Sequence, residues 1–217
     1  MTPIAINQSL SKMENDKPLS ETESIALIQN MIHKAQGAVG DKSFYFLIWG
    51  WLVFIAAMSQ YCMVKFIPAL RDYNGLPWAI LMPLGGILSG VHGYRERKKE
   101  KVRTYTGDLL KYVSIAFGVS LFIVLFFCSI NEGWENAYPM IMMVYGMWLF
   151  ISGGALKFTP LIVGGIIDWC CSIGSFYVPQ SHSIELIPIL AFAVFAGYII
   201  PGHMLNAKHK REINEAV

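Results

Sequence analysis

Residues 109–130 read LLKYVSIAFGVSLFIVLFFCSI, a run of 22 residues in which Lys111 is the only charged side chain. A helix needs roughly 20 apolar residues to cross about 30 Å of hydrocarbon, because each residue adds about 1.5 Å. A stretch this long and this apolar is best accommodated in lipid. It predicts a helix that crosses a bilayer.

The rest of the chain has the composition of a membrane protein. Of its 217 residues, 54% are hydrophobic and 15% are charged, whereas a soluble domain carries about 25% charged residues. Six spans of roughly 20 residues would occupy about 120 residues and leave no room for a separate soluble domain. The predicted fold class is an all-α bundle of six transmembrane helices. The expected spans are residues 43–61, 78–94, 109–130, 138–156, 159–177 and 184–205.

The prolines fall at two kinds of position in these spans. Pro139 and Pro160 lie where the fourth and fifth spans are expected to begin, which is the helical position that proline tolerates best. Pro83, Pro188 and Pro201 lie inside spans, and we expect them to kink their helices.

Polar segments flank the predicted bundle. Residues 1–19 are irregular and polar and are expected to be a disordered tail. Ser20-Glu21-Thr22-Glu23 fits a capping box and precedes apolar residues at helical spacing. A short amphipathic helix is therefore expected over residues 20–38 on the cytoplasmic face, where it packs against the bundle or docks a soluble partner. Residues 206–217 are expected to be a cytoplasmic tail.

The distribution of basic residues predicts the orientation. With the N-terminus in the cytoplasm, 15 of the 17 Lys and Arg residues fall on the cytoplasmic side and only Lys65 and Arg71 fall outside. Positive charge next to spans favours the cytoplasmic side. Both termini are therefore expected in the cytoplasm, in the inner membrane of a bacterium. The basic run at residues 95–103 is explained by this topology, with Glu96 and Glu100 as helical ion-pair partners, so no nucleic-acid partner is expected.

Asp168 is the residue that breaks the membrane pattern. It lies about nine residues into the fifth span, hence roughly 14 Å deep. A carboxylate near mid-bilayer costs at least a few kcal/mol, and such residues are often functional. We expect Asp168 to be protonated at neutral pH or hydrogen-bonded to groups such as Ser120 or Tyr145. Its role is either to relay a proton or an ion, or to form a neutral hydrogen bond between helices.

Small residues predict the helix contacts, because helices in lipid associate through close packing. The second span contains a G-x-x-x-G motif at Gly86 and Gly90, and the fifth places Gly164 on the same face as Asp168. The other spans have similar faces, with Gly50 and Ala57 in the first, Gly146 and Gly153 in the fourth, and Ala193 and Gly197 in the sixth.

No motif for catalysis, cofactor binding or metal binding is found in the sequence. Signatures of zinc proteases, serine hydrolases and phosphate-binding loops are absent. The four cysteines form no C-x-x-C pair. A disulfide between Cys62 and Cys128 is conceivable, because both lie near the outer ends of their spans. No cofactor is expected, and an enzyme is the least favoured class.

Three strings resemble an uncharacterised family of small six-span bacterial inner-membrane proteins. They are Trp49-Gly50-Trp51, Pro83-Leu84-Gly85-Gly86 and the stretch from Ser152 to Gly165, SGGALKFTPLIVGG. The resemblance covers roughly residues 21–207. It implies an inner-membrane location and carries no activity or site residues.

Two functional classes follow from these observations. The favoured one is a multi-pass protein that acts through helix contacts with itself or with a membrane or cytoplasmic partner, as a scaffold, accessory or sensor subunit. The alternative is a small solute, ion or proton transporter that uses Asp168.

Overall fold

The computed structural model describes residues 43–99, 105–130 and 134–214, and the regular structure in these ranges is helical throughout. The α-helices in these ranges are α3 (Ser43–Phe66), α4 (Leu76–Lys99), α5 (Tyr105–Ile130), α6 (Trp134–Ala155), α7 (Thr159–Ser175), α8 (Leu186–Val194) and α9 (Ile200–Asn214). Two 3-10 helices, η1 (Pro68–Tyr73) and η2 (Gln180–Glu185), lie between them. The segment η3 (Phe195–Ile199) is a π-helix that joins α8 to α9. The tail at 1–19 and the amphipathic helix at 20–38 lie outside the described residues.

Five helical runs in the described residues are long and apolar enough to cross a membrane. They cover residues 43–66, 76–95, 107–130, 136–155 and 181–211. The predicted span at 159–177 coincides with α7, which is apolar but has 17 residues and is about 25 Å long. The all-α class is confirmed, with five long apolar helices.

Several helix boundaries differ from those expected; α3 ends at Phe66 rather than near residue 61, and α5 begins at Tyr105 rather than near residue 109. The fourth span was expected from Tyr138, with Pro139 at its start, but α6 begins at Trp134 and Pro139 lies inside the helix. The first turn of α6 is polar, so hydropathy places the boundary too late. The last helix continues through Asn214, because extending an existing helix is easy and Arg211 in the last turn favours the negative helix end.

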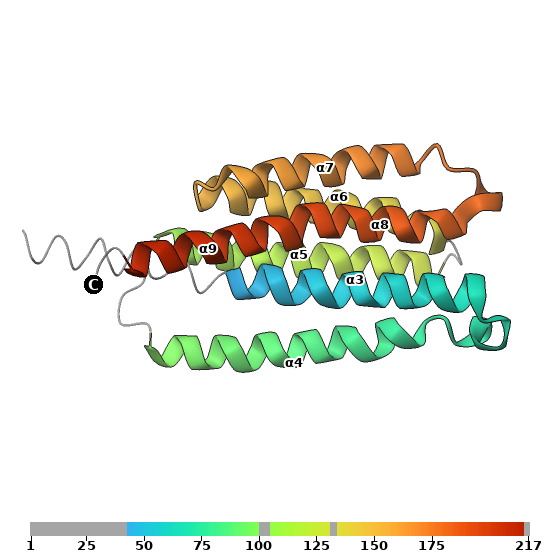
Figure 1. Ribbon diagram of the computed structural model, residues 1–217, viewed down its shortest axis with the longest axis horizontal. Helices are drawn as coiled ribbons and strands as arrows, with labels where there is room; N and C mark the ends of the chain where they lie inside the picture. Colours follow the sequence, from blue (N-terminus) through green and yellow to red (C-terminus); the bar gives the residue numbers. More distant parts are fainter. Residues whose placement is uncertain (1–42, 100–104, 131–133, 215–217) are drawn as a thin grey trace, which may run out of the picture. The chain divides into compact units, whose positions relative to one another are not determined.

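The helices pack in a sequence different from their order in the chain. In Figure 1, α3 lies between α4 and the run formed by α8, η3 and α9. That run also packs against α7, which pairs with α6, and α6 contacts α5. The buried core lies between α3, α6, α7 and the last helical run, with side chains such as Val53, Leu149, Leu161 and Leu190 fully or almost fully buried.

Glycines bring α6 and α7 into a close helical hairpin. A methyl group added at Gly146 would lie 2.8 Å from the Gly165 carbonyl oxygen, and one added at Gly153 would lie 2.7 Å from the Ile162 nitrogen. Hydrogen bonds reinforce the pairing, because Trp169 Nε1 donates to the Met143 carbonyl (3.1 Å) and Ser172 Oγ donates to the Pro139 carbonyl (2.7 Å). The hairpin fixes the height of Asp168 in the bundle.

The turn between α6 and α7 is a Schellman motif. The Phe158 amide donates to the Gly153 carbonyl (2.9 Å) and the Lys157 amide donates to the Gly154 carbonyl (3.2 Å). Lys157 occupies the left-handed position with φ 51°, where glycine is the usual residue. Pro160 then sits in the first turn of α7, as the sequence predicted.

Candidate functional site

Asp168 is fully buried in the described part of the bundle. Its exposed fraction is 0%, and neither carboxyl oxygen has a hydrogen-bond partner among the described residues. It lies nine residues after the first residue of α7, about 14 Å along the helix. A buried carboxyl group without a cation or donor is most stable in its neutral form, and then it can donate one hydrogen bond as well as accept.

The π segment η3 forms the wall opposite Asp168. A methyl group added at Gly197 would lie 2.9 Å from Asp168 Oδ1 and 2.9 Å from Leu149 Cδ1. A methyl group added at Gly164 would lie 2.8 Å from the Gly197 carbonyl oxygen, and one at Gly50 would lie 3.0 Å from Tyr198 Cβ. Glycines from α3, α7 and η3 therefore allow the backbones to meet around the carboxyl group.

Pro201 explains why the last helix widens at this level. In an α-helix, the nitrogen of residue 201 would donate to the carbonyl of Gly197, but proline has no N–H and its ring clashes with that carbonyl. The chain instead makes a π-helical bond from the Ile200 amide to the Phe195 carbonyl. Single π turns of this kind occur frequently at functional sites.

Two buried tyrosines surround the site. The Tyr145 and Tyr198 rings are 5.4 Å apart in an edge-to-face arrangement, and both lie within electrostatic range of the Asp168 carboxyl group. The Tyr198 hydroxyl has no hydrogen-bond partner among the described residues. The expected hydrogen bonds from Asp168 to Ser120 or Tyr145 are absent among the described residues; Ser120 instead lines a separate apolar cavity of about 540 Å³ with Met143, Met147 and Trp169.

Two buried hydroxyl groups lie along α7 between Asp168 and the η2 end of the bundle. Ser172 and Ser175 are buried and follow Asp168 along α7, four and seven residues further on. Ser175 lines a cavity of about 150 Å³ together with Asn136, Pro139 and Ser183. Asn136 and Pro179 on its wall are exposed. The cavity therefore reaches the surface where η2 lies.

The two glycines of the predicted motif in the second span, Gly86 and Gly90, lack the close helix contacts that the other small residues make. Methyl groups added at Gly86 or Gly90 would meet nothing within 4 Å, although Gly85 packs against Leu52 and Trp49 of α3. The predicted motif therefore makes no contact within the described chain. Gly164, by contrast, lies against Gly197.

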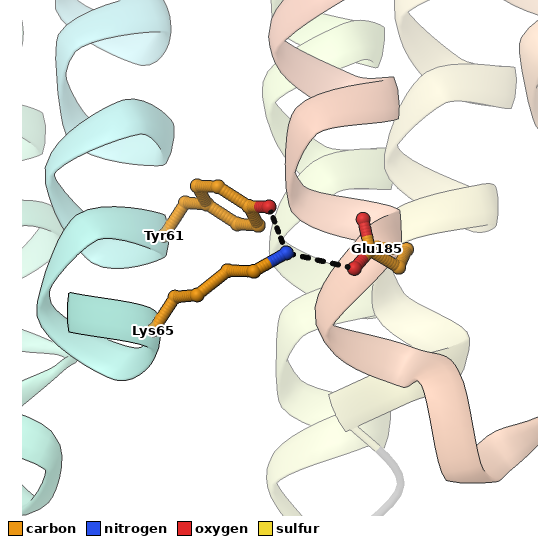
Figure 2. Close-up of polar contacts among 3 residues, drawn as sticks. All are labelled: Tyr61, Lys65 and Glu185. Carbon is orange, nitrogen blue, oxygen red and sulfur yellow. Dashed lines mark hydrogen bonds and ion pairs between the residues drawn. The ribbon is translucent and has the colours of Figure 1, made fainter. Parts of the chain in front are cut away.

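Polar groups hold the helices together at the η1–η2 end. Gln60 Oε1 accepts hydrogen bonds from Trp78 Nε1 (2.7 Å) and from the Tyr138 hydroxyl (3.2 Å). Figure 2 shows Lys65 Nζ between the Tyr61 hydroxyl (2.6 Å) and Glu185 Oε1 (3.3 Å). These contacts connect α3 to α4, to α6 and to the end of η2.

The cysteines and other potential metal ligands form no site in the described ranges. Cys62, Cys128, Cys170 and Cys171 are free thiols, so the conceivable disulfide between Cys62 and Cys128 is not formed. No group of three or more His, Cys, Asp or Glu side chains in residues 43–99, 105–130 and 134–214 is arranged to hold a metal ion.

Comparison with protein-family models, with curated proteins and with solved structures finds no match for this chain. The resemblance drawn from its sequence strings stays a prediction.

The sequence pointed to Asp168 and to Tyr145 near it, but not to the π segment opposite the carboxyl group. The π segment had a readable signal, since Pro201 follows Gly197 by four residues in an otherwise apolar span. The hydrogen bonds of Gln60 had no such signal in the sequence, because its two partners lie 18 and 78 residues away along the chain.

Proposed function

We propose that this chain is a six-span protein of the bacterial inner membrane, with both termini in the cytoplasm, that acts through helix contacts with a second membrane protein chain. α7 supplies the sixth span in this proposal, because a largely apolar helix of 17 residues lies at the lower end of the range that crosses a bilayer. The asymmetry of basic residues in the sequence supports the orientation.

The observation that carries this proposal is the exposed face of α4. Its principal packing partner among the described elements is α3, and methyl groups added at Gly86 or Gly90 would meet nothing within 4 Å. Apolar side chains face lipid without cost, but two glycines one turn apart let a second helix approach closely. Ile80, Ile87 and Val91 on the same helix are exposed and supply van der Waals contacts beside them.

Disulfide crosslinking in intact membranes tests this contact. Gly86→Cys and Gly90→Cys are introduced into a chain whose four native cysteines are replaced by alanine. Gly118→Cys is the matched control, because Gly118 in α5 also has nothing within 4 Å. Adducts at Gly86 and Gly90 that exceed those at Gly118 support the proposal, and equal yields at all three positions contradict it.

A second candidate function is transport of a proton, an ion or a small solute through the Asp168 site. The observation that favours it is the fully buried carboxyl group beside a π segment, whose two oxygens have no hydrogen-bond partner in the part of the chain that the structure describes. Flux measurements in liposomes with the wild-type chain and Asp168→Asn test it. Equal flux in both proteins excludes a role for Asp168 in transport.

A further inference from the structure

Three features follow one another along α7: the buried carboxyl group of Asp168, the buried hydroxyl groups of Ser172 and Ser175, and the cavity at the η2 end. Ser175 lines the cavity, and Pro139, which also lines it, accepts the Ser172 hydrogen bond through its carbonyl oxygen. The three α7 side chains are spaced by three and four residues, so they lie on one face of the helix. The distance along the axis from Ser175 to Asp168 is about 10 Å.

We propose that Asp168 is a proton-binding site that exchanges its proton with the solvent at the η2 end of the bundle, through Ser172 and Ser175. This inference deepens the second candidate function by naming its ligand and its entrance. It concerns binding and exchange, and holds whether or not the proton continues across the membrane.

The cavity is large enough for the water that the exchange needs. Its volume of about 150 Å³ accommodates several molecules at about 30 Å³ each. One helical turn is about 5.4 Å, which is close to the length of two O–H···O hydrogen bonds of about 2.7 Å each. A single water between successive side chains would complete the connection.

The transfer balances without any further reactant. A proton from a hydronium ion in the cavity goes to a hydroxyl oxygen, which passes its own proton onward, and the last one reaches a carboxylate oxygen of Asp168. Ser172 Oγ and Ser175 Oγ donate to the carbonyls of Pro139 (2.7 Å) and Cys171 (2.8 Å), and each keeps lone pairs that can accept. Each hydroxyl group therefore has to break that bond and rotate toward the next acceptor before it passes its proton on. The reverse sequence releases the proton.

The groups around Asp168 favour a bound proton over a bound metal cation. Among the described residues, the titratable groups that interact electrostatically with it are Tyr145 from α6, Tyr198 from η3 and Cys171 from its own helix. No cationic side chain of the described residues interacts with it. A neutral carboxyl group leaves no buried charge, whereas a metal ion requires several oxygen ligands.

Infrared spectroscopy of the full chain in detergent tests the proposal. The carbonyl stretch of a neutral carboxyl group shifts when its proton is replaced by deuterium, so transfer into D₂O records the exchange directly. We expect a neutral-carboxyl band at pH 7 that is absent in Asp168→Asn. Absence of such a band in the wild-type chain overturns the proposal.

Ser175→Val and Ser175→Thr form an isosteric pair that differs only in the hydroxyl group. We expect exchange to slow about tenfold in Ser175→Val, the effect of one lost hydrogen-bonded step, and to return toward the wild-type rate in Ser175→Thr. Ser152→Ala is the control, because Ser152 is buried in α6 outside this line. Equal rates in the valine and threonine variants, or slowing confined to Ser152→Ala, overturn the entrance at η2.

The exchange assay uses no gradient, so its outcome is independent of transport. Exchange that depends on Ser175, combined with flux that Asp168→Asn leaves unchanged, supports the proton site and excludes the transporter. If Ser175→Val does not elute as a folded species, Ser172→Val and Ser172→Thr provide the same comparison one turn deeper.

Discussion

Replacing Gly164 by alanine tests the close approach of α7 and η3. The added methyl group would lie 2.8 Å from the Gly197 carbonyl oxygen and 2.9 Å from Gly197 Cα. Both are backbone atoms, so no side-chain rotation relieves the contact and the two helices must separate. Overpacking of this kind costs about 1–3 kcal/mol, which the helix propensity of alanine, about 1 kcal/mol better than glycine, offsets in part.

We therefore expect Gly164→Ala to lower the free energy of unfolding by up to about 2 kcal/mol. Gly118→Ala is the control, because a methyl group at Gly118 meets nothing within 4 Å, and it should gain about 0.5–1 kcal/mol from helix propensity alone. The free energies are measured by titration with sodium dodecyl sulfate in mixed micelles, followed by circular dichroism. If Gly164→Ala is as stable as Gly118→Ala, the packing of α7 on η3 is not as described.

Three other substitutions test separate parts of the bundle. Lys157→Gly should raise the free energy of unfolding by about 1 kcal/mol, since it removes a side chain from a left-handed position, and Lys157→Ala should not; equal effects would contradict the assigned turn. Gln60→Leu should lower the free energy of unfolding by about 1–3 kcal/mol, because the indole N–H of Trp78 loses its acceptor. An unchanged free energy of unfolding in the same titration would refute that hydrogen bond. Replacing Lys65 and Glu185 singly and together should show no measurable coupling, because the pair is exposed, and a strong coupling in this double-mutant cycle would show that the ion pair is shielded from water.

The helical class follows from the sequence because it depends on local properties. The lipid bilayer is the one favourable environment for an apolar run such as residues 109–130. Each such run satisfies its backbone hydrogen bonds within its own helix, whatever the neighbouring helices are. The close contacts of Gly146, Gly153 and Gly197 confirm the expectation for these positions, since a missing side chain permits backbone contact wherever a second helix is available. The bounds of the apolar run around Asp168 likewise predict that this residue lies near the middle of its helix.

The choice of neighbours does not follow from local properties. Gly86 and Gly164 look alike in sequence, yet one faces open space and the other touches η3. What differs is the arrangement of helices, which depends on the sum of many weak van der Waals contacts. Helix ends are uncertain for a related reason: α6 accepts a polar first turn before Pro139, because interfacial residues need not be apolar.

The carboxyl group and the π segment occur together for a physical reason. The Pro201 ring removes the α-helical donor of the Gly197 carbonyl, and the backbone widens to make a π-helical bond. The widened turn presents Gly197, without a side chain, directly to Asp168 Oδ1, so the carboxyl group faces backbone at a point where the regular pattern of hydrogen bonds is already interrupted. A buried polar group without a hydrogen-bond partner is costly inside an apolar bundle, and Pro201 leaves the Gly197 carbonyl without its α-helical donor at the level of Asp168.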